Sequence, residues 1–226
     1  NAYYDKSEFL WKITVNNKIE SFSDLVICTG HYTKPNIPLD YQSFTGKLTH
    51  SINYKTPKEF KNQNVLIIGG GSSAVQIASD LVESAKKVVL SIRSMPYILP
   101  RYINNQTLFD FYQFCQFLSE SEIVDLLYKY KAHQTLFNIP APNQKILNST
   151  TIPICDDIFS HSEKNQINFS GKVIEINGDI VKFDNYESRF DTIILATGYN
   201  LDFDFFDFKV EYSNNLYHVV NKDNPS

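Results

Sequence analysis

The residues best placed to do chemistry are the small ones of Gly69-x-Gly71-x-x-Ala74, which lie between two different apolar patterns. Before them, residues 64–68 form a short apolar run typical of a strand buried on both faces of a parallel sheet. After them, apolar residues recur at helical spacing from Ala74 to Val82. A strand-to-helix turn of this kind brings backbone N–H groups to an anion at the helix N-terminus. The pattern predicts a site for a dinucleotide pyrophosphate, made by Gly69, Gly71, Ser72, Ser73 and Ala74.

A second apolar strand follows at 87–93, where a βαβ unit requires one. A site for NAD would place Asp or Glu about 20 residues after the first glycine, to bind the ribose 2′-hydroxyl. Here Arg93 stands at the end of the second strand and no acid lies beside it. The sequence therefore predicts NADP, with Arg93 as the cation for the 2′-phosphate. A solvated surface arginine and a glycine-rich turn without a ligand are the alternatives.

Length, charge and cysteine usage limit the classes of protein to which the chain can belong. A chain of 226 residues can form one large or two modest domains. Its net charge of −4, without any basic run, argues against nucleic acid as a partner. Cys28, Cys115 and Cys155 are scattered, which predicts a reduced intracellular protein with neither a disulfide framework nor a metal site. The sequence contains no signal peptide and no apolar run near 18 residues.

Two parts of the chain repeat one layout. Residues 8–22 and 167–187 alternate as strands of a meander, and each meander precedes an apolar, buried strand that ends in Thr-Gly, at 25–30 and at 191–198. The repeat predicts an α/β protein with two dinucleotide-binding, Rossmann-like domains, each with a parallel sheet and a β-meander. Only the second copy follows a glycine turn. We therefore expect the first domain to be incomplete and the chain to be a fragment cut at both ends.

One stretch between these features points to a known family. Residues 44–54 match F-x-G-x-x-x-H-x-x-x-Y/F at Phe44, Gly46, His50 and Tyr54, just before the glycine turn. This stretch resembles the signature of flavin-containing monooxygenases. Residues 26–38 are similar to that family's first Thr-Gly strand and proline turn, and residues 196–199 are similar to its second Thr-Gly strand.

The resemblance implies how the domains divide. Residues 1–57 would be a partial FAD-binding domain, 58–195 the NADP-binding domain, and 196–226 the return to the FAD-binding domain. Thr29-Gly30 would lie near the flavin, and Thr197-Gly198 near NADP or at the domain junction. The family's N-terminal glycine loop for FAD and its C-terminus have no counterpart in this sequence.

The resemblance also implies a reaction, an N,N-dimethylaniline-type oxygenation with FAD, NADPH and O₂. NADPH would reduce the flavin, O₂ would react with it, and a nitrogen or sulfur nucleophile would take one oxygen atom. Related Baeyer–Villiger enzymes end the signature with Trp, so Tyr54 favours the nitrogen- and sulfur-oxygenating branch. Cofactors supply such chemistry, and we assign no catalytic residue. For His50, a general base is one hypothesis; a linker close to NADP and a structural histidine bonded to backbone are the others.

Two other classes stay open. A pyridine-nucleotide disulfide reductase shares the architecture but needs paired redox cysteines, and an NADP-binding protein without catalysis needs only the glycine turn. The expected partners are a small nucleophilic substrate and O₂. For the full-length protein, a homodimer and membrane association are not excluded. The expected location is the cytoplasm, with the endoplasmic reticulum membrane as an alternative for the full-length protein.

Residues 104–131 have a helical pattern. One stripe consists of Leu108, Phe111, Tyr112 and Cys115. The capping box Ser119-x-x-Glu122 then predicts the start of a second helix. We interpret these helices as core packing and a lid over the cofactor domain. Arg101, just before them, is a weaker candidate for a second cation near the NADP phosphate.

Overall fold

The computed structural model describes residues 1–30, 32–38, 41–103, 106–107, 110, 119, 121–122, 125, 134–143, 152–200, 203–206, 211–212 and 219–220. The chain divides into two compact units. Unit 1 comprises residues 1–34 and 199–226, and unit 2 comprises residues 35–198.

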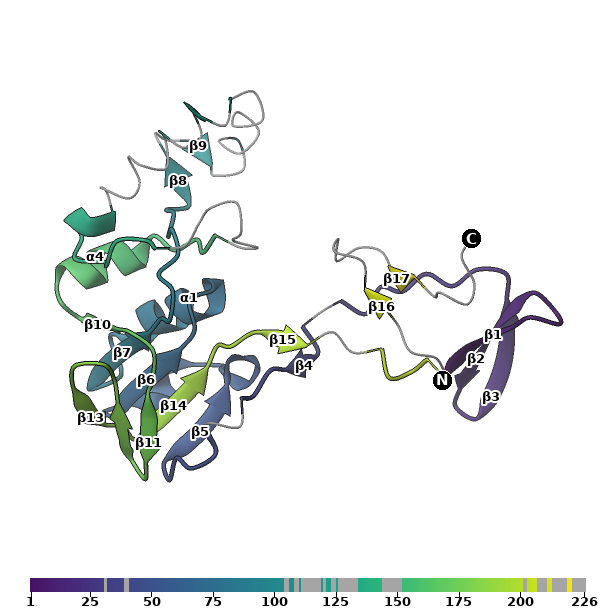
Figure 1. The fold of residues 1–226 in the computed structure, drawn as a ribbon, viewed down its shortest axis with the longest axis horizontal. Helices are drawn as coiled ribbons and strands as arrows, with labels where there is room; N and C mark the ends of the chain where they lie inside the picture. Colours follow the sequence, from purple (N-terminus) through teal and green to yellow (C-terminus); the bar gives the residue numbers. More distant parts are fainter. Residues whose placement is uncertain are drawn as a thin grey trace. The chain divides into compact units, whose positions relative to one another are not determined.

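Unit 2 is built around a five-stranded parallel sheet with the strand order β10-β7-β6-β14-β5 (Figure 1). Its strands are β5 (Lys47–His50), β6 (Asn64–Ile68), β7 (Lys87–Ser91), β10 (Ile167–Ser170) and β14 (Thr192–Leu195). Helix α1 (Ser72–Leu81) connects β6 to β7, as the sequence predicts. The α/β class with a parallel sheet is confirmed.

The alternation of side chains along β6 explains why its whole apolar run is buried. Val65 and Ile67 face a core cluster that includes residues of α1, whereas Leu66 and Ile68 face a second cluster. The second cluster includes Val181 of the meander, so both faces of the sheet are covered. Burial of each such side chain contributes roughly 1.5–3 kcal/mol. Only a strand buried on both faces tolerates an unbroken apolar run.

Smaller elements complete unit 2. The antiparallel meander consists of β11 (Glu175–Asn177), β12 (Ile180–Lys182) and β13 (Glu187–Arg189). The turn at Gly178 has a φ of 64°, and β11 and β12 on either side of it confirm this part of the meander predicted within 167–187. Residues 167–170 do not belong to the meander, because they form β10 and pair in parallel with β7. The remaining elements are η2 (Ser51–Asn53), η3 (Pro57–Phe60), α4 (Asp157–Glu163) and the pair β8 (Tyr102–Ile103) and β9 (Gln106–Thr107). The two-stranded sheet of β4 (Lys34–Pro35) and β15 (Tyr199–Asn200) belongs to unit 1 except for Pro35.

Unit 1 contains the antiparallel sheet β1-β2-β3, formed by Ala2–Asp5, Leu10–Val15 and Lys18–Phe22. It also contains the short pair β16 (Glu211–Tyr212) and β17 (Val219–Val220). The two strands predicted within residues 8–22 are confirmed as β2 and β3.

The buried strand predicted at 25–30 is wrong. This segment forms no strand, and Val26 is 80% exposed while Leu25 and Ile27 are only half-buried. Exposed and half-buried side chains alternate along this segment, as they do in an extended chain. However, no residue that the structure describes pairs with the backbone of this segment. An apolar run becomes a buried strand only where neighbouring strands supply hydrogen bonds and cover both faces.

The helical prediction for 104–131 is wrong at its start and confirmed at the capping box. Gln106–Thr107 lie in strand β9, so the helix does not begin at 104. The capping box is confirmed, because the Ser119 N–H donates to Glu122 Oε2 at 2.8 Å and the Glu122 N–H donates to Ser119 Oγ at 3.4 Å. The predicted stripe 108–115 lies outside the described residues.

The division of the chain into two units falls at 34/35 and at 198/199, so residues 35–57 are counted in unit 2. The cofactor assignment of segments 1–57, 58–195 and 196–226 stays a prediction.

Candidate functional site

Most of the predicted site residues meet at one edge of the parallel sheet. Ile68 of β6 pairs with Ser91 of β7 on one side and with Leu195 of β14 on the other. Leu195 pairs in turn with His50 of β5. The carboxyl ends of these strands are where α/β sheets bind ligands. At this edge, formed by the carboxyl ends of the strands, lie the predicted residues that follow β6, β7 and β14, namely Gly69, Gly71, Ser72, Ser73, Ala74, Arg93, Thr197 and Gly198.

Gly69 is a glycine for reasons internal to the fold. Its φ of +143° lies in a region that residues with a side chain rarely adopt. A Cβ at this position would lie 2.2 Å from the Ala196 carbonyl oxygen. The Gly69 N–H donates to the Ser91 carbonyl at 3.0 Å. The first glycine of the motif therefore allows the turn and the close approach of the loop that follows β14.

Gly71 has no such internal reason. A Cβ at Gly71 would meet no protein atom within 4 Å, and its φ of −88° suits any residue. Among the described residues, the backbone N–H groups of Gly71, Ser72 and Ser73 have no hydrogen-bond acceptor. These are the orphan donors at the start of α1, and no side chain caps them. The second glycine thus leaves space beside N–H groups that suit an anion.

The remaining motif residue, Ala74, lies in the first turn of α1 and is fully buried, where a small side chain lets helix and sheet pack closely. Arg93 lies two residues past the end of β7 rather than within the strand. Its side chain is exposed, and it forms no hydrogen bond or ion pair with any residue that the structure describes. The guanidinium is therefore available to a phosphate.

Arg101, the weaker candidate, is engaged elsewhere. Its Nε lies 3.7 Å from Asp156 Oδ2, and its N–H donates to Asp156 Oδ1 at 2.6 Å. Both residues line a polar cavity of about 480 Å³ between α1 and α4.

Thr197 and Gly198 are held by two residues of other segments. The Thr197 hydroxyl donates to the Asn36 carbonyl at 2.5 Å. The Gly198 carbonyl accepts from the Asn36 N–H at 3.0 Å and lies 3.1 Å from His50 Nε2. Asn36 and His50 of the signature thus hold the second Thr-Gly step. No motif in the sequence singles out Asn36.

His50 is bonded to backbone, as one of the hypotheses for it states. It is 2% exposed, and its Nδ1 accepts from the Ile52 N–H at 3.3 Å. Because the Gly198 carbonyl can only accept, the neutral ring with its proton on Nε2 satisfies both contacts. Burial lowers the pKa of His50, and the bond to Gly198 opposes this only in part.

A pH dependence follows from the lowered pKa of His50. The unfolded chain takes up a proton near the ordinary histidine pKa of about 6.5, before the folded chain does. The stabilisation from His50 is therefore complete above about pH 6.5 and is lost as the pH falls. We expect urea unfolding between about pH 7.5 and 5.5 to show a smaller loss of stability in His50→Gln than in wild type. The control is His161→Gln, and parallel curves for wild type and His50→Gln would contradict the assignment.

The first half of the signature lies at the opposite end of β5. A Cβ at Gly46 would lie 2.6 Å from both the Asp191 carbonyl oxygen and the ring of Phe44. Phe44 is buried and forms a bridge to Gly178 of the meander turn. These two signature residues therefore fix the meander against β5, and the structure places neither at the nucleotide edge.

Tyr54 ends the signature and contacts α1. Its hydroxyl donates to Asp80 Oδ2 at 2.6 Å, and its ring stacks on Phe60 with the centroids 5.5 Å apart. Desolvation, and then the bond to Asp80, raise the pKa of Tyr54. Asp80 is a contact that the helix pattern could not reveal, because it lies on the exposed face of α1.

Tyr54→Phe is expected to lower the free energy of unfolding by about 0.5–1.5 kcal/mol, since one hydrogen bond to an exposed carboxylate is lost and the stack is kept. Urea unfolding followed by circular dichroism measures this. Tyr186→Phe is the matched control, because Tyr186 also stacks on a phenylalanine but its hydroxyl has no hydrogen bond among the described residues. Equal effects of the two substitutions would count against the Tyr54–Asp80 bond.

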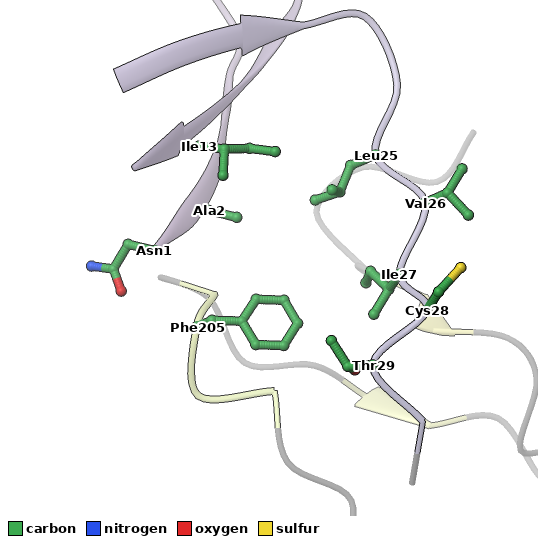
Figure 2. Close-up of a pocket in the computed structure, with 9 residues that line it drawn as sticks. All are labelled: Asn1, Ala2, Ile13, Leu25, Val26, Ile27, Cys28, Thr29 and Phe205. Atoms are coloured by element: carbon green, nitrogen blue, oxygen red, sulfur yellow. The ribbon is translucent and has the colours of Figure 1, made fainter. Parts of the chain in front are cut away.

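Thr29 and Gly30 belong to unit 1, whereas the glycine turn belongs to unit 2. Thr29 lines an apolar cavity of about 210 Å³ together with Leu25, Ile27 and Phe205 (Figure 2). Gly30 has a φ of +72° and open space around it. The place of the two residues near a flavin stays a prediction.

Two features are absent from the described part of the chain. No helix there has the length and apolar character needed to cross a bilayer. No group of three or more His, Cys, Asp or Glu side chains in that part could hold a metal ion.

Comparison with known proteins identifies relatives of the chain. The model of the flavin-binding monooxygenase-like family matches residues 8–222. Flavin-containing monooxygenase 5 of Oryctolagus cuniculus is 26% identical over 217 residues, which are 89% of this chain and 40% of that protein. Indole-3-pyruvate monooxygenase YUCCA1 of Oryza sativa is 28% identical over 88% of this chain and 52% of that protein. The chain thus spans about half the length of such relatives, or less.

Solved structures show the same fold. A crystal structure of OTEMO in complex with FAD and NADP superposes with a TM-score of 0.64 at 19% identity, over 88% of this chain and 52% of that one. An open structure of cyclohexanone monooxygenase has a TM-score of 0.64 at 15% identity, over 88% of this chain and 53% of that one. These neighbours carry Rossmann-like domains, and they confirm the predicted fold class.

Proposed function

The chain belongs to the flavin-binding monooxygenase-like family, and we propose that it is the NADP-binding part, with adjoining FAD-domain segments, of an NADPH-dependent flavin monooxygenase. The single observation that carries the proposal is the geometry at Gly71. The N–H groups of Gly71, Ser72 and Ser73 have no acceptor among the described residues, and the space where a Cβ of Gly71 would stand is open. Both the donors and the space lie where β6 turns into α1, and the neighbouring strand β7 leads to Arg93. An anion and a second, more distant phosphate would satisfy the two features together.

The residues at this edge of the sheet offer the donors and the cation that the phosphates of NADP require. The N–H groups of Gly71, Ser72 and Ser73 would bind the pyrophosphate, and the guanidinium of Arg93 would bind the 2′-phosphate. Thr197 and Gly198, held by Asn36 and His50, would close the edge beside the glycine turn. When bound, NADPH supplies the hydride and FAD the reaction with O₂. The contribution of this chain is then to hold the nucleotide and keep water from the reacting groups.

The case for FAD rests on the family. The described residues of unit 1 contain no glycine-rich strand-to-helix turn, and segment 25–30 lacks paired strands. We therefore assign no flavin contact beyond the prediction for Thr29 and Gly30. The 226-residue chain alone is expected to be inactive.

We propose nitrogen or sulfur nucleophiles as substrates because the signature ends in Tyr54 rather than Trp. Family membership by itself does not choose the substrate. Relatives of similar identity include the indole-3-pyruvate monooxygenase above and a 4-hydroxybenzoate brominase of Marinomonas mediterranea, 28% identical over 225 residues. The disulfide-reductase alternative has little support, because Cys28 and Cys155 are both free thiols and Cys155 is buried against Ser79.

The test needs the whole monooxygenase that this proposal implies, with this chain as its NADP-binding part. We expect NADPH consumption with FAD and O₂ present to yield a tertiary amine or thioether product that carries one more oxygen atom, detected by mass spectrometry. Alkylation of exposed thiols should leave the rate unchanged. Reduction of a disulfide substrate in place of oxygenation would support the reductase, and nucleotide binding without any turnover would support the non-catalytic alternative.

A further inference from the structure

The loop that carries Arg93 packs directly against the glycine turn. A Cβ at Gly70 would lie 3.0 Å from Ile92 Cγ2 and 3.6 Å from Pro96 Cδ. Ile92, Met95 and Ile98 of this loop are buried in the same core cluster as α1. The spacing between the predicted pyrophosphate and 2′-phosphate sites therefore depends on how this loop is held.

Gln134 holds the middle of the loop from the other side. Its side chain is 1% exposed and forms three hydrogen bonds. Oε1 accepts from the Ile98 N–H at 3.1 Å, while Nε2 donates to the Pro96 carbonyl at 3.2 Å and to the Pro140 carbonyl at 2.9 Å. One amide thus joins two backbone groups of the loop that carries Arg93 to the Pro140 carbonyl.

The chemistry of the loop explains why an amide is needed. The Ile98 N–H and the Pro96 carbonyl belong to a buried stretch that is part of no strand or helix. Buried backbone groups need partners, and these three need one acceptor and two donors. A terminal amide supplies them, because its NH₂ group donates twice and its oxygen accepts, whereas a hydroxyl has a single proton to donate. Loss of the amide would leave a donor and two acceptors unpaired, and the loop would relax toward water.

We propose that Gln134 is a positioning residue for nucleotide discrimination, acting through the Pro96 carbonyl and the Ile98 N–H to set where Arg93 stands relative to the glycine turn. This inference rests on the proposed NADP site. It predicts that Gln134 affects NADPH, which carries the 2′-phosphate, much more than NADH, although Gln134 contacts neither phosphate site.

The test is calorimetric titration of the 226-residue chain and its Gln134→Met variant with NADPH and NADH. Methionine has a similar length but no hydrogen-bonding amide. We expect the dissociation constant for NADPH to rise about fivefold or more and that for NADH to change less than about twofold. Val181→Ala, in the core cluster on the other face of the sheet, is the control for general destabilisation and should leave the ratio of the two constants unchanged.

A double variant separates positioning from general damage. If Gln134 acts through Arg93, Gln134→Met should not lower the NADPH preference further when Arg93→Ala is already present. Gln134→Asn, which has both amide functions but is one methylene shorter, takes the place of Gln134→Met if that variant does not fold. An unchanged NADPH to NADH ratio in a folded Gln134 variant would overturn the inference alone. A wild-type chain without NADPH preference would overturn the proposed site itself.

Discussion

Gly71→Val is expected to abolish the binding of both NADPH and NADH while the chain stays folded. The φ of −88° at Gly71 accommodates valine, and no protein atom lies within 4 Å of the added Cβ. The branched side chain would instead fill the space beside the orphan N–H groups at the start of α1. A hydrogen bond to a charged group contributes about 1.5–3 kcal/mol. Loss of two such bonds to the pyrophosphate should therefore weaken nucleotide binding by about a hundredfold or more. Calorimetric titration measures this, and circular dichroism checks the fold.

Gly69→Ala is the matched contrast, because the two glycines are two residues apart and serve different purposes. At Gly69 the φ of +143° and the Ala196 carbonyl, 2.2 Å from the Cβ position, both oppose a side chain. That variant should lose about 2 kcal/mol or more of unfolding free energy. If Gly71→Val unfolded the chain, or bound NADPH like the wild type, the assignment of Gly71 to the phosphate site would be wrong.

Arg93→Ala is expected to weaken NADPH binding by about 1.5–3 kcal/mol, roughly tenfold to a hundredfold, and to leave NADH binding nearly unchanged. The guanidinium has no partner among the described residues, so its removal should cost little stability. The two nucleotides differ only in the 2′-phosphate, and their comparison therefore isolates this one contact. Parallel titrations with NADPH and NADH give the two dissociation constants.

Arg189→Ala is the control for loss of one positive charge. Arg189 is exposed and pairs with Asp179 on the meander, with Nη1 2.9 Å from Oδ2. Its removal changes the net charge of the chain as Arg93→Ala does, yet it should leave both nucleotides unaffected. An equal weakening of NADPH and NADH by Arg93→Ala would remove Arg93 from the 2′-phosphate site.

The centre of unit 2 could be predicted from the sequence because its signals are local. The change from a strand run to helical spacing around Gly69 fixes β6, α1 and the turn between them. The helix stripe likewise identified the buried face of α1, where Ala74 and Ala78 are fully buried. These features depend on neighbours within about ten residues.

Segment 25–30 shows the limit of the same reasoning. Its residues resemble those of β14, and both end in Thr-Gly, but only β14 has β5 and β6 on its two sides. A buried strand depends on partners far away in the sequence, which a local pattern does not contain.

The contacts that hold the site were also out of reach. Asn36, Gln134 and Asp80 are ordinary polar residues in the sequence, and each acts on a group far along the chain. For His50, a structural histidine was one of several hypotheses, and the contacts to Ile52 and Gly198 that favour it lie outside any local pattern.

The most direct test of the central claim is a titration of the purified 226-residue chain, shown to be folded by circular dichroism, with NADPH and NADH in parallel. The geometry of Gly71 and Arg93 predicts that NADPH binds at least about tenfold more tightly than NADH. Equal affinities would contradict the 2′-phosphate role of Arg93. Binding of neither nucleotide by a folded chain would contradict the site as a whole.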